Sequence, residues 1–305
     1  MKTTTNEKME QTGFSILIPT WNNLSYLKLC VESIRRHSCM QHQIIVHVND
    51  GSDGTLDWVK QEGLDYTHSE ENVGVCLAMN MMRRLVKTPY IYFINDDMYV
   101  LPDWDRVLMN EVNSLPNEMF YLSGTMIQPH DSNDVGLCIN YGDSIETFQE
   151  ERLLKEYMNE PYADWQGSTR PPCLVHRNTW DLVGGYSIEL SPGMYSDPDF
   201  AAKLLMVGVR YFKGLGNSRV YHFETKTTTR IKKNNGSLQF LLKWGISNSS
   251  MRKYITRQGE PWADRQRPID ATSLRKAARF AKLKTIVYLL TKGFGGAKNL
   301  AEQVL

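Results

Sequence analysis

The sequence predicts an α/β protein with a mostly parallel sheet that is covered by helices on both faces. Two observations support this class. In the first hundred residues, short and continuously apolar segments alternate with segments of helical periodicity, as expected for strands joined by helical crossovers. The chain also has 305 residues, of which 41% are hydrophobic, which is enough for one large domain or two small ones.

Four strands and three helices are expected in this first part. The strands cover residues 14–18, 43–48, 64–68 and 90–94, and the helices cover residues 24–37, 55–59 and 75–86. The first helix has one apolar stripe from Leu24 to Ile34, so a single face should pack on the sheet. Asn22 or Asn23 is suited to cap it, because a side-chain oxygen can accept from the free backbone N–H groups of the first turn.

The second part of the chain is less regular. Helices are expected at residues 104–112, 179–183, 200–207 and 274–290, and strands at residues 120–126, 171–176, 209–213 and 218–222. Residues 127–167 are polar and irregular, so no element is assigned to them. The last helix is basic and amphipathic.

The fourth strand runs directly into two adjacent acids, Asp96 and Asp97. Neighbouring carboxylates repel each other unless a cation or a hydrogen-bond donor compensates their charge. Carboxylate oxygens at the carboxyl end of a strand suit a divalent ion with a bound diphosphate. The alternative is that one acid caps a following helix while the other is solvated.

Polar side chains follow each of the first four strands, at the edge where their carboxyl ends meet. They are Thr20, Trp21 and Asn22, then Asn49 and Asp50, then Asn72, and finally Asp96 and Asp97. We expect these side chains to form one crevice, with Thr20, Asn22 and Asn72 among its substrate contacts. Neither a G-x-G-x-x-G motif after the first strand nor a G-x-x-x-x-G-K-[ST] motif is present, so phosphates would have to be held by a metal ion.

Composition limits the partners and the compartment. Thirty-five Lys and Arg balance 34 Asp and Glu, so no nucleic-acid partner is expected. The polar N-terminus resembles no secretory signal, and no run reaches the roughly 18 apolar residues of a membrane span. The five scattered cysteines have no C-x-x-C spacing and are interpreted as reduced thiols. We therefore expect a cytoplasmic protein.

The motifs of residues 14–225, taken in order, resemble the inverting glycosyltransferases of family 2, which have the GT-A fold. The matching segments are Ser15-Ile-Leu-Ile-Pro-Thr-Trp-Asn22, Val48-Asn-Asp-Gly-Ser-Asp-Gly-Thr55, Asn72-Val-Gly74, Ile94-Asn-Asp-Asp97, Gly184-Gly-Tyr186, Ser196-Asp-Pro-Asp-Phe200 and His222. The resemblance implies a Rossmann-like sheet, to which this chain adds a C-terminal helical extension. We expect a donor-binding half at residues 1–125, an acceptor-binding half at residues 126–225 and the extension at residues 226–305.

The resemblance also assigns roles to residues of the donor site. It implies that Trp21 stacks on the nucleotide base and that Asp50 accepts the imide N–H of uracil or thymine. Asp96 would bond the ribose hydroxyls, and Asp97 would hold Mn²⁺ or Mg²⁺ on the diphosphate. His222 resembles a histidine that completes the metal or phosphate site in some members. The alternatives are core packing for Trp21 and a structural role at a strand end for His222.

In the acceptor half, Asp197 occupies the place of the catalytic base in the family's Glu-Asp-x-Asp-Leu element. Asp199 is grouped with the substrate-binding residues and is expected to cap the helix that follows. The alternative for Asp197 is that it is a second capping acid and not the base. Two departures from the family are Asn49, where the family has Asp, and Ser196, where it has Glu.

The resemblance implies a metal-dependent, inverting glycosyltransferase. It would move a sugar from a UDP-sugar, or alternatively a dTDP-sugar, to a hydroxyl of a glycan or lipid-linked acceptor in polysaccharide biosynthesis. A sugar-nucleotide pyrophosphorylase and a non-catalytic glycan- or nucleotide-binding module are the alternatives. Residues 225–233 could form a lid over the diphosphate or an ordinary surface loop. The basic terminal helix could contact the inner face of the membrane or pack on the protein's own core.

Overall fold

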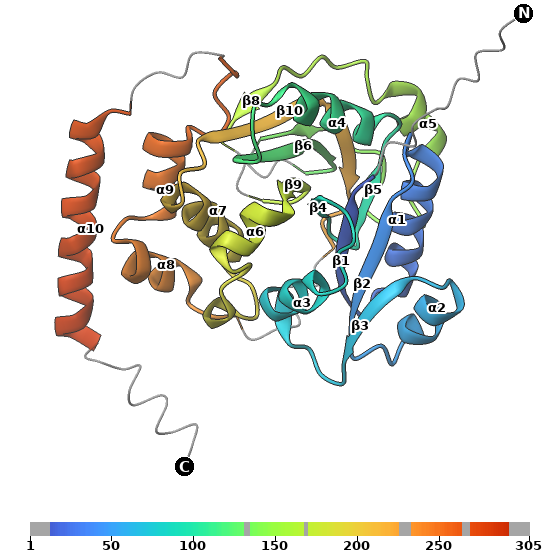
Figure 1. Cartoon of the computed structure of the whole chain (residues 1–305), viewed down its shortest axis with the longest axis horizontal. Coiled ribbons are helices and arrows are strands. Elements are labelled where there is room, and N and C mark those ends of the chain that lie inside the picture. Colours follow the sequence, from blue (N-terminus) through green and yellow to red (C-terminus); the bar gives the residue numbers. More distant parts are fainter. Residues whose placement is uncertain (1–12, 131–134, 168–169, 226–232, 264–268, 293–305) are drawn as a thin grey trace, which may run out of the picture.

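The computed structural model describes residues 13–130, 135–167, 170–225, 233–263 and 269–292. A ten-stranded sheet runs through the molecule in the order β3-β2-β1-β4-β9-β6-β10-β5, with β7 beside β6 and β8 beside β10 (Figure 1).

The first half of the chain builds the parallel part of this sheet. Its strands are β1 (Ser15–Trp21), β2 (Gln43–Asn49), β3 (Asp65–Ser69) and β4 (Tyr90–Phe93), which pair in parallel through β3-β2-β1-β4. The connecting helices are α1 (Leu24–His37), α2 (Thr55–Gln61) and α3 (Gly74–Arg83). The predicted alternation of strands and helices is confirmed for every element of this half.

The second half makes the sheet mixed, where the sequence predicted a mostly parallel one. Its main strands are β5 (Met98–Val100), β6 (Phe120–Gln128), β9 (Cys173–His176) and β10 (Tyr211–His222). β9 is antiparallel to both β4 and β6, and β5 is antiparallel to β10. A single strand, β10, replaces the two predicted strands, because the chain keeps pairing with β6 across a register shift between Leu215 and Arg219.

The unassigned residues 127–167 contain short elements that periodicity did not reveal. They are β7 (Leu137–Cys138), α5 (Glu150–Glu156) and β8 (Trp165–Gln166). The remaining elements of this half are α4 (Trp104–Ser114), α6 (Arg177–Val183), the 3-10 helix η1 (Ile188–Leu190) and α7 (Ser196–Met206). Two-residue strands and single helical turns are too short for a hydrophobic period to emerge.

The sheet separates two hydrophobic cores. On one face, α1 and α4 pack on strand residues such as Ile16, Val46 and Tyr92. On the other face, α3, α6 and α7 pack on strand residues that include Leu17 and Ile45. Residues that are neighbours in a strand thus enter opposite cores, because strand side chains alternate between faces. Continuous apolar strands are the consequence of this double coverage.

The C-terminal extension comprises α8 (Gly236–Trp244), α9 (Asn248–Met251), the π-helix η3 (Arg252–Thr256) and α10 (Ala271–Lys292). The long helix α10 lies alongside α8 and η3 at the end of the molecule far from α1 (Figure 1). Within the described part of the chain, no helix combines the length and the hydrophobicity that a membrane span requires.

Candidate functional site

A cavity of about 410 Å³ opens at the carboxyl ends of β1, β2 and β4. It is lined by Pro19, Thr20, Trp21, Asn49, Asn72, Gly74, Val75, Asn95, Asp96, Asp97, Pro192, His222, Glu224 and Thr225. Six of the predicted site residues therefore meet in one cavity: Thr20, Trp21, Asn72, Asp96, Asp97 and His222. Asn22 and Asp50 are outside this lining and contact each other, and Asp197 and Asp199 belong to α7.

The paired acids lie in the short connection between β4 and β5, so the capping alternative does not apply because no helix starts there. Both are largely buried, with 8% of Asp96 and 6% of Asp97 exposed. Thr20, near the end of β1, donates its hydroxyl to Asp96 Oδ2 over 2.6 Å. This bond fixes one carboxylate and joins the ends of two adjacent strands.

Asp97 is held by the chain segment that follows β10. The backbone N–H and the hydroxyl of Thr225 both donate to Asp97 Oδ2, over 2.9 and 2.8 Å. His222 Nε2 lies 3.4 Å from the other oxygen, Oδ1. The antiparallel pairing of β10 with β5, which sets His222 opposite Met98, brings these residues together across more than a hundred positions of sequence.

Burial alone would raise the pKa of Asp97, but the charge and hydrogen bond of His222 and the hydrogen bonds from Thr225 outweigh it. The pKa of this carboxyl is consequently lowered, and the side chain is ionised at neutral pH. A buried, ionised carboxylate next to a cavity is a group that can bind a cation.

Asp97 and His222 fit a divalent ion that takes its other ligands from a substrate. No cluster of three or more His, Cys, Asp or Glu side chains suited to a metal occurs among the residues described. Mg²⁺ and Mn²⁺ bound to nucleotides need only one or two protein ligands, because phosphate oxygens and water complete the shell. His222 Nδ1 is buried and has no hydrogen-bond partner among the described residues, so the polar contact of this ring with Asp97 is made through Nε2. The residues present therefore fit a metal–diphosphate site better than an all-protein metal cage.

The loops after β1 and β2 are locked together by Asn22 and Asp50. Asn22 Nδ2 donates to Asp50 Oδ2 over 2.8 Å, and Asn22 Oδ1 accepts the Gly51 N–H over 2.9 Å. Both residues have positive φ angles, 45° and 63°, which Asn and Asp tolerate better than other residues with a Cβ. The hydrogen bond from Asn22 is the main cause that lowers the pKa of Asp50.

Asn49 explains why this chain can lack the aspartate of the family at that position. Its amide donates to Thr20 O over 3.1 Å and its Oδ1 accepts the Val73 N–H over 2.9 Å. A side chain that must both donate and accept between β1 and the loop before α3 requires an amide rather than a carboxylate. Asn72 makes its own turn by accepting the Gly74 N–H over 2.9 Å.

Asp197 lies within the first turn of α7, which begins at Ser196 and not at Phe200 as the sequence predicted. The Tyr186 hydroxyl donates to Asp197 Oδ1 over 3.0 Å. The backbone of Tyr186 is in turn held by Asn80 of α3, which accepts its N–H and donates to its carbonyl. Gly185 is required here, because a Cβ would meet Asn80 Oδ1 at 2.3 Å.

The environment of Asp197 favours its protonated form more than water does. Desolvation raises the pKa of Asp197 to about 6, and the Tyr186 hydrogen bond and the charge of Arg170 oppose this rise only in part. A carboxyl with a pKa close to neutral can both accept and release a proton under physiological conditions.

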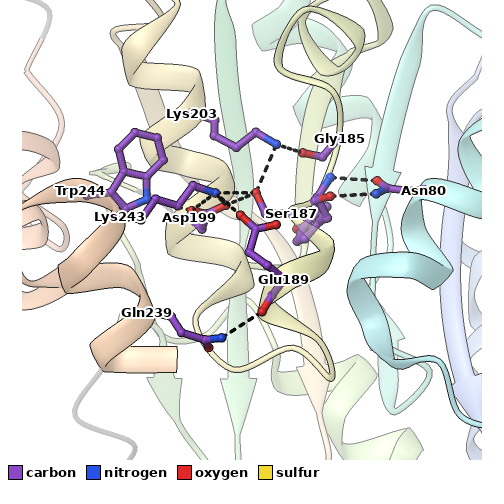
Figure 2. Close-up of polar contacts among 10 residues, drawn as sticks. Asn80, Gly185, Ser187, Glu189, Asp199, Lys203, Gln239, Lys243 and Trp244 are labelled. Atoms are coloured by element: carbon purple, nitrogen blue, oxygen red, sulfur yellow. Dashed lines mark hydrogen bonds and ion pairs between the residues drawn. The ribbon is translucent and has the colours of Figure 1, made fainter. Parts of the chain in front are cut away.

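The prediction that Asp199 caps α7 is wrong. The N-cap position is Tyr195, and no side chain caps the helix. Asp199 is fully buried and is bonded instead by Ser187, Lys243 and Trp244 (Figure 2). Sequence reasoning could not identify this, because two of the three partners belong to the extension beyond the recognised motifs.

The sequence also missed several residues that line the cavity. Val75 at the start of α3 and Pro192 contact each other through a backbone hydrogen bond of 2.9 Å, which brings the loop before α7 to the cavity. Thr225 is the first residue of the segment 225–233 that was expected to form a lid or a surface loop, and it bonds Asp97. Residues 226–232 lie outside the described residues.

A mixed α/β sheet with an aromatic residue, amides and paired acids at its carboxyl edge is the architecture of the GT-A class. The sequence model of "Glycosyl transferase family 2" matches residues 15–165. The chain accordingly carries a domain of glycosyltransferase family 2 with the GT-A fold.

Curated relatives and solved structures are similar to parts of this chain. EpsH of Bacillus subtilis (strain 168) is 29% identical over 101 residues, which are 32% of this chain and 29% of EpsH. Chondroitin synthase of Escherichia coli is 21% identical over 250 residues, 79% of this chain and 33% of the synthase. The chain thus matches about a third or less of the length of either protein. The crystal structure of S. aureus TarS 1–349 in complex with UDP-GlcNAc superposes with a TM-score of 0.55 at 14% identity, over 76% of this chain and 65% of that one, so it shares the fold.

Proposed function

We propose that this protein is a metal-dependent, inverting glycosyltransferase that uses a nucleotide-diphosphate sugar, with UDP-sugars preferred. One observation carries the proposal: Trp21, Asp96, Asp97 and His222, which come from three separate segments, line one cavity at the carboxyl edge of the sheet. Residues 1–125 would form the donor half of the site and residues 126–225 the acceptor half.

The donor's base and ribose would be bound by the β1 and β2 ends of the cavity. Trp21 lines the cavity and offers a ring on which a base can stack. Asp50, which follows β2 outside the cavity lining and is fixed by Asn22, offers an acceptor for the imide N–H of uracil. Asp96, oriented by Thr20, can accept hydrogen bonds from ribose hydroxyls. TarS, which shares the fold, was crystallised with UDP-GlcNAc, and this supports a uracil-containing donor.

The diphosphate would lie against Asp97 and His222. A Mn²⁺ or Mg²⁺ ion bound there would neutralise the charge that develops on the departing nucleoside diphosphate. Asp97 is suited to hold the ion because its pKa is lowered and its Oδ2 is fixed by Thr225.

Asp197 would accept the proton of the acceptor hydroxyl. The hydroxyl oxygen attacks the anomeric carbon, the bond from that carbon to the diphosphate oxygen breaks, and the hydroxyl proton moves to Asp197. A single displacement of this kind inverts the anomeric configuration. Asp197 is suited to the task because its pKa, about 6, leaves it mostly ionised at pH 7 while it still binds a proton readily.

The acceptor would be a glycan or a lipid-linked saccharide in polysaccharide biosynthesis, at the cytoplasmic face of a membrane. The similarity to chondroitin synthase supports a glycan acceptor. The surface of α10 supports membrane contact: it buries Ala281 and leaves Phe280, Leu283, Ile286 and Leu290 more than half exposed. Arg275, Lys276, Arg279, Lys282 and Lys284 are exposed on the same helix and could bind anionic headgroups.

Analysis of the released product tests this function against its alternatives. The protein is incubated with Mn²⁺ and a panel of UDP-, dTDP-, GDP- and ADP-sugars, and the soluble products are separated by ion-exchange chromatography. Release of UDP is the expected result. Formation of a nucleoside triphosphate when pyrophosphate is added would indicate a pyrophosphorylase, and binding without any product would indicate a non-catalytic module.

A further inference from the structure

A polar network outside the cavity surrounds the buried carboxylate of Asp199 (Figure 2). Trp244 Nε1 donates to Asp199 Oδ1 over 2.8 Å, and Lys243 Nζ lies 3.0 Å from the same oxygen. The Ser187 hydroxyl donates to Oδ2 over 2.6 Å. Since Lys243 and Trp244 end α8, the extension supplies both the cation and the indole donor that this carboxylate needs.

Helix α8 and the residue before it make further polar contacts with the chain that precedes α7. Lys243 also contacts Ser187 Oγ at 2.9 Å and Glu189 Oε1 at 2.8 Å, and Gln239 Nε2 donates to Glu189 O over 3.0 Å. Just before α8, the Asn234 amide accepts the Met194 N–H and donates to the Met194 carbonyl. We refer to Asn234, Gln239, Lys243 and Trp244 as the clasp, and to residues 185–199 as the base segment.

The base segment carries the proposed catalytic base, Asp197, and borders the donor cavity through Pro192. From the α3 side, Asn80 holds the backbone of Tyr186, whose hydroxyl bonds Asp197. From the opposite side, Lys243 and Trp244 of the clasp hold Asp199 (Figure 2). Asp199 lies two residues beyond Asp197 in the same helical turn. The two sets of contacts together determine where the first turn of α7 lies.

We propose that Lys243 and Trp244 of the extension are positioning residues that act through Asp199 to hold Asp197 in its catalytic orientation. The inference rests on the proposed role of Asp197 as the base. It gives the extension a function in the reaction, although α8 lies beyond both the matched family region and the recognised motifs.

Lys243 and Trp244 are expected to affect Asp197 because Asp199 is fully buried and its negative charge must be compensated. Its compensating cation, Lys243, also binds Glu189, so the loop around η1 and the first turn of α7 are bonded to one ammonium group. Removing that group takes away the only ion-pair partner that Asp199 has among the described residues, because the nearby ammonium of Lys203 bonds Gly185 O and Ser187 Oγ instead. The first turn of α7 is then expected to move toward solvent to hydrate the carboxylate. A displacement of about 1 Å in a reacting group is enough to reduce a rate by roughly 100-fold.

The test compares Lys243→Met and Trp244→Phe with wild type, with Lys243→Arg as the conservative variant. Lys155→Met, at an exposed position of α5, is the matched control. UDP release from UDP-GlcNAc with Mn²⁺ and water as the acceptor gives kcat and KM over a range of pH, and calorimetry gives the Kd of UDP with Mn²⁺. Hydrogen exchange of the peptides that cover residues 187–199 reports on the base segment without turnover.

We expect kcat to fall roughly 10- to 100-fold in both variants, while KM and the UDP Kd change by less than about twofold. The acidic limb of the pH profile should move to lower pH, since solvent access would return the pKa of Asp197 toward its ordinary value. Amides of the base segment should exchange faster, Lys243→Arg should recover most of the lost rate, and Lys155→Met should match wild type.

Two results would overturn the inference and leave the proposed function intact. The first is an unchanged kcat. The second is a lower kcat that comes with no shift of the acidic limb of the pH profile and no change in the hydrogen exchange of the base segment. Wild-type protein that neither binds UDP with Mn²⁺ nor releases it from UDP-GlcNAc would overturn both. Trp244→Phe keeps an aromatic side chain and removes the indole N–H donor, so this variant tests the inference if Lys243→Met fails to fold.

Discussion

Replacing Asp197 by Asn should separate catalysis from stability. The amide oxygen of Asn can still accept the hydrogen bond that Tyr186 donates to Asp197 Oδ1 over 3.0 Å, so the local geometry should be kept. The group that takes the acceptor proton is lost, and removal of a general base lowers rates by roughly 100- to 10,000-fold. We expect kcat to fall in this range while the UDP affinity stays unchanged.

The raised pKa of Asp197 also predicts how pH acts on the wild type. With a pKa of about 6, the carboxylate is about 90% ionised at pH 7 and about 10% ionised at pH 5. The wild-type kcat/KM, which reports the ionisation of the free enzyme, should consequently fall about tenfold between these pH values, with a limb near pH 6 that Asp197→Asn lacks.

The same pKa predicts that the variant is more stable at neutral pH. A folded-state pKa of about 6 against an ordinary value of 3.8 means that the fold disfavours the ionised carboxyl. This penalty is fully present above about pH 6 and disappears as the pH falls below about 4, and its upper value is about 3 kcal/mol. Asp197→Asn should therefore unfold at a higher denaturant concentration at pH 7.5, and at nearly the same concentration as wild type at pH 4.

The assay measures UDP release at several pH values and urea unfolding at pH 4 and pH 7.5. Asp57→Asn is the control, because Asp57 is an exposed acid in the first turn of α2. A variant with near-normal kcat, or one that is less stable than wild type at pH 7.5, would refute the reasoning about Asp197.

Three further predictions concern the donor base, the extension and the buried network. UDP or dTDP with Mn²⁺ should raise the melting temperature more than ADP or GDP does, and Asp50→Ala should remove the difference; tighter binding of ADP or GDP would show that Asp50 does not recognise a pyrimidine. Deletion of residues 270–305 should weaken co-sedimentation with anionic vesicles without changing the UDP affinity, whereas unfolding of the truncated protein would place α10 in the core. Asp199→Asn should lower the free energy of unfolding by about 2 kcal/mol because it leaves Lys243 without its buried partner, and an unchanged urea midpoint would contradict this.

The sequence predicted the first half of the chain well because its signals are local. Apolar strands, helical stripes and polar strand ends fixed the places of Trp21, Asp96 and Asp97 at one edge of a sheet, and the structure brings these three residues to one cavity. Topology then follows from the rule that parallel strands share their carboxyl edge.

The second half of the chain was harder to predict because its contacts join distant segments. The pairing of His222 with the region of Asp97 depends on β10 running antiparallel to β5, and no local pattern encodes that pairing. The role given to Asp199 failed for the same reason: an Asp near a helix start usually caps it, but here Lys243 and Trp244 provide stronger partners from a helix more than forty residues away.

The central claim is that Asp97 holds a donor diphosphate through a divalent cation, and calorimetric titration with UDP tests it most directly. Wild-type protein is titrated with Mn²⁺ present and again in excess EDTA, and Asp97→Ala is titrated with Mn²⁺ after its melting temperature has been shown to match that of wild type. We predict that UDP binds wild type tightly with Mn²⁺, at least tenfold more weakly in EDTA, and equally weakly to Asp97→Ala under both conditions. Full UDP affinity and full turnover in EDTA, or Mn²⁺-dependent binding that survives in Asp97→Ala, would contradict the claim.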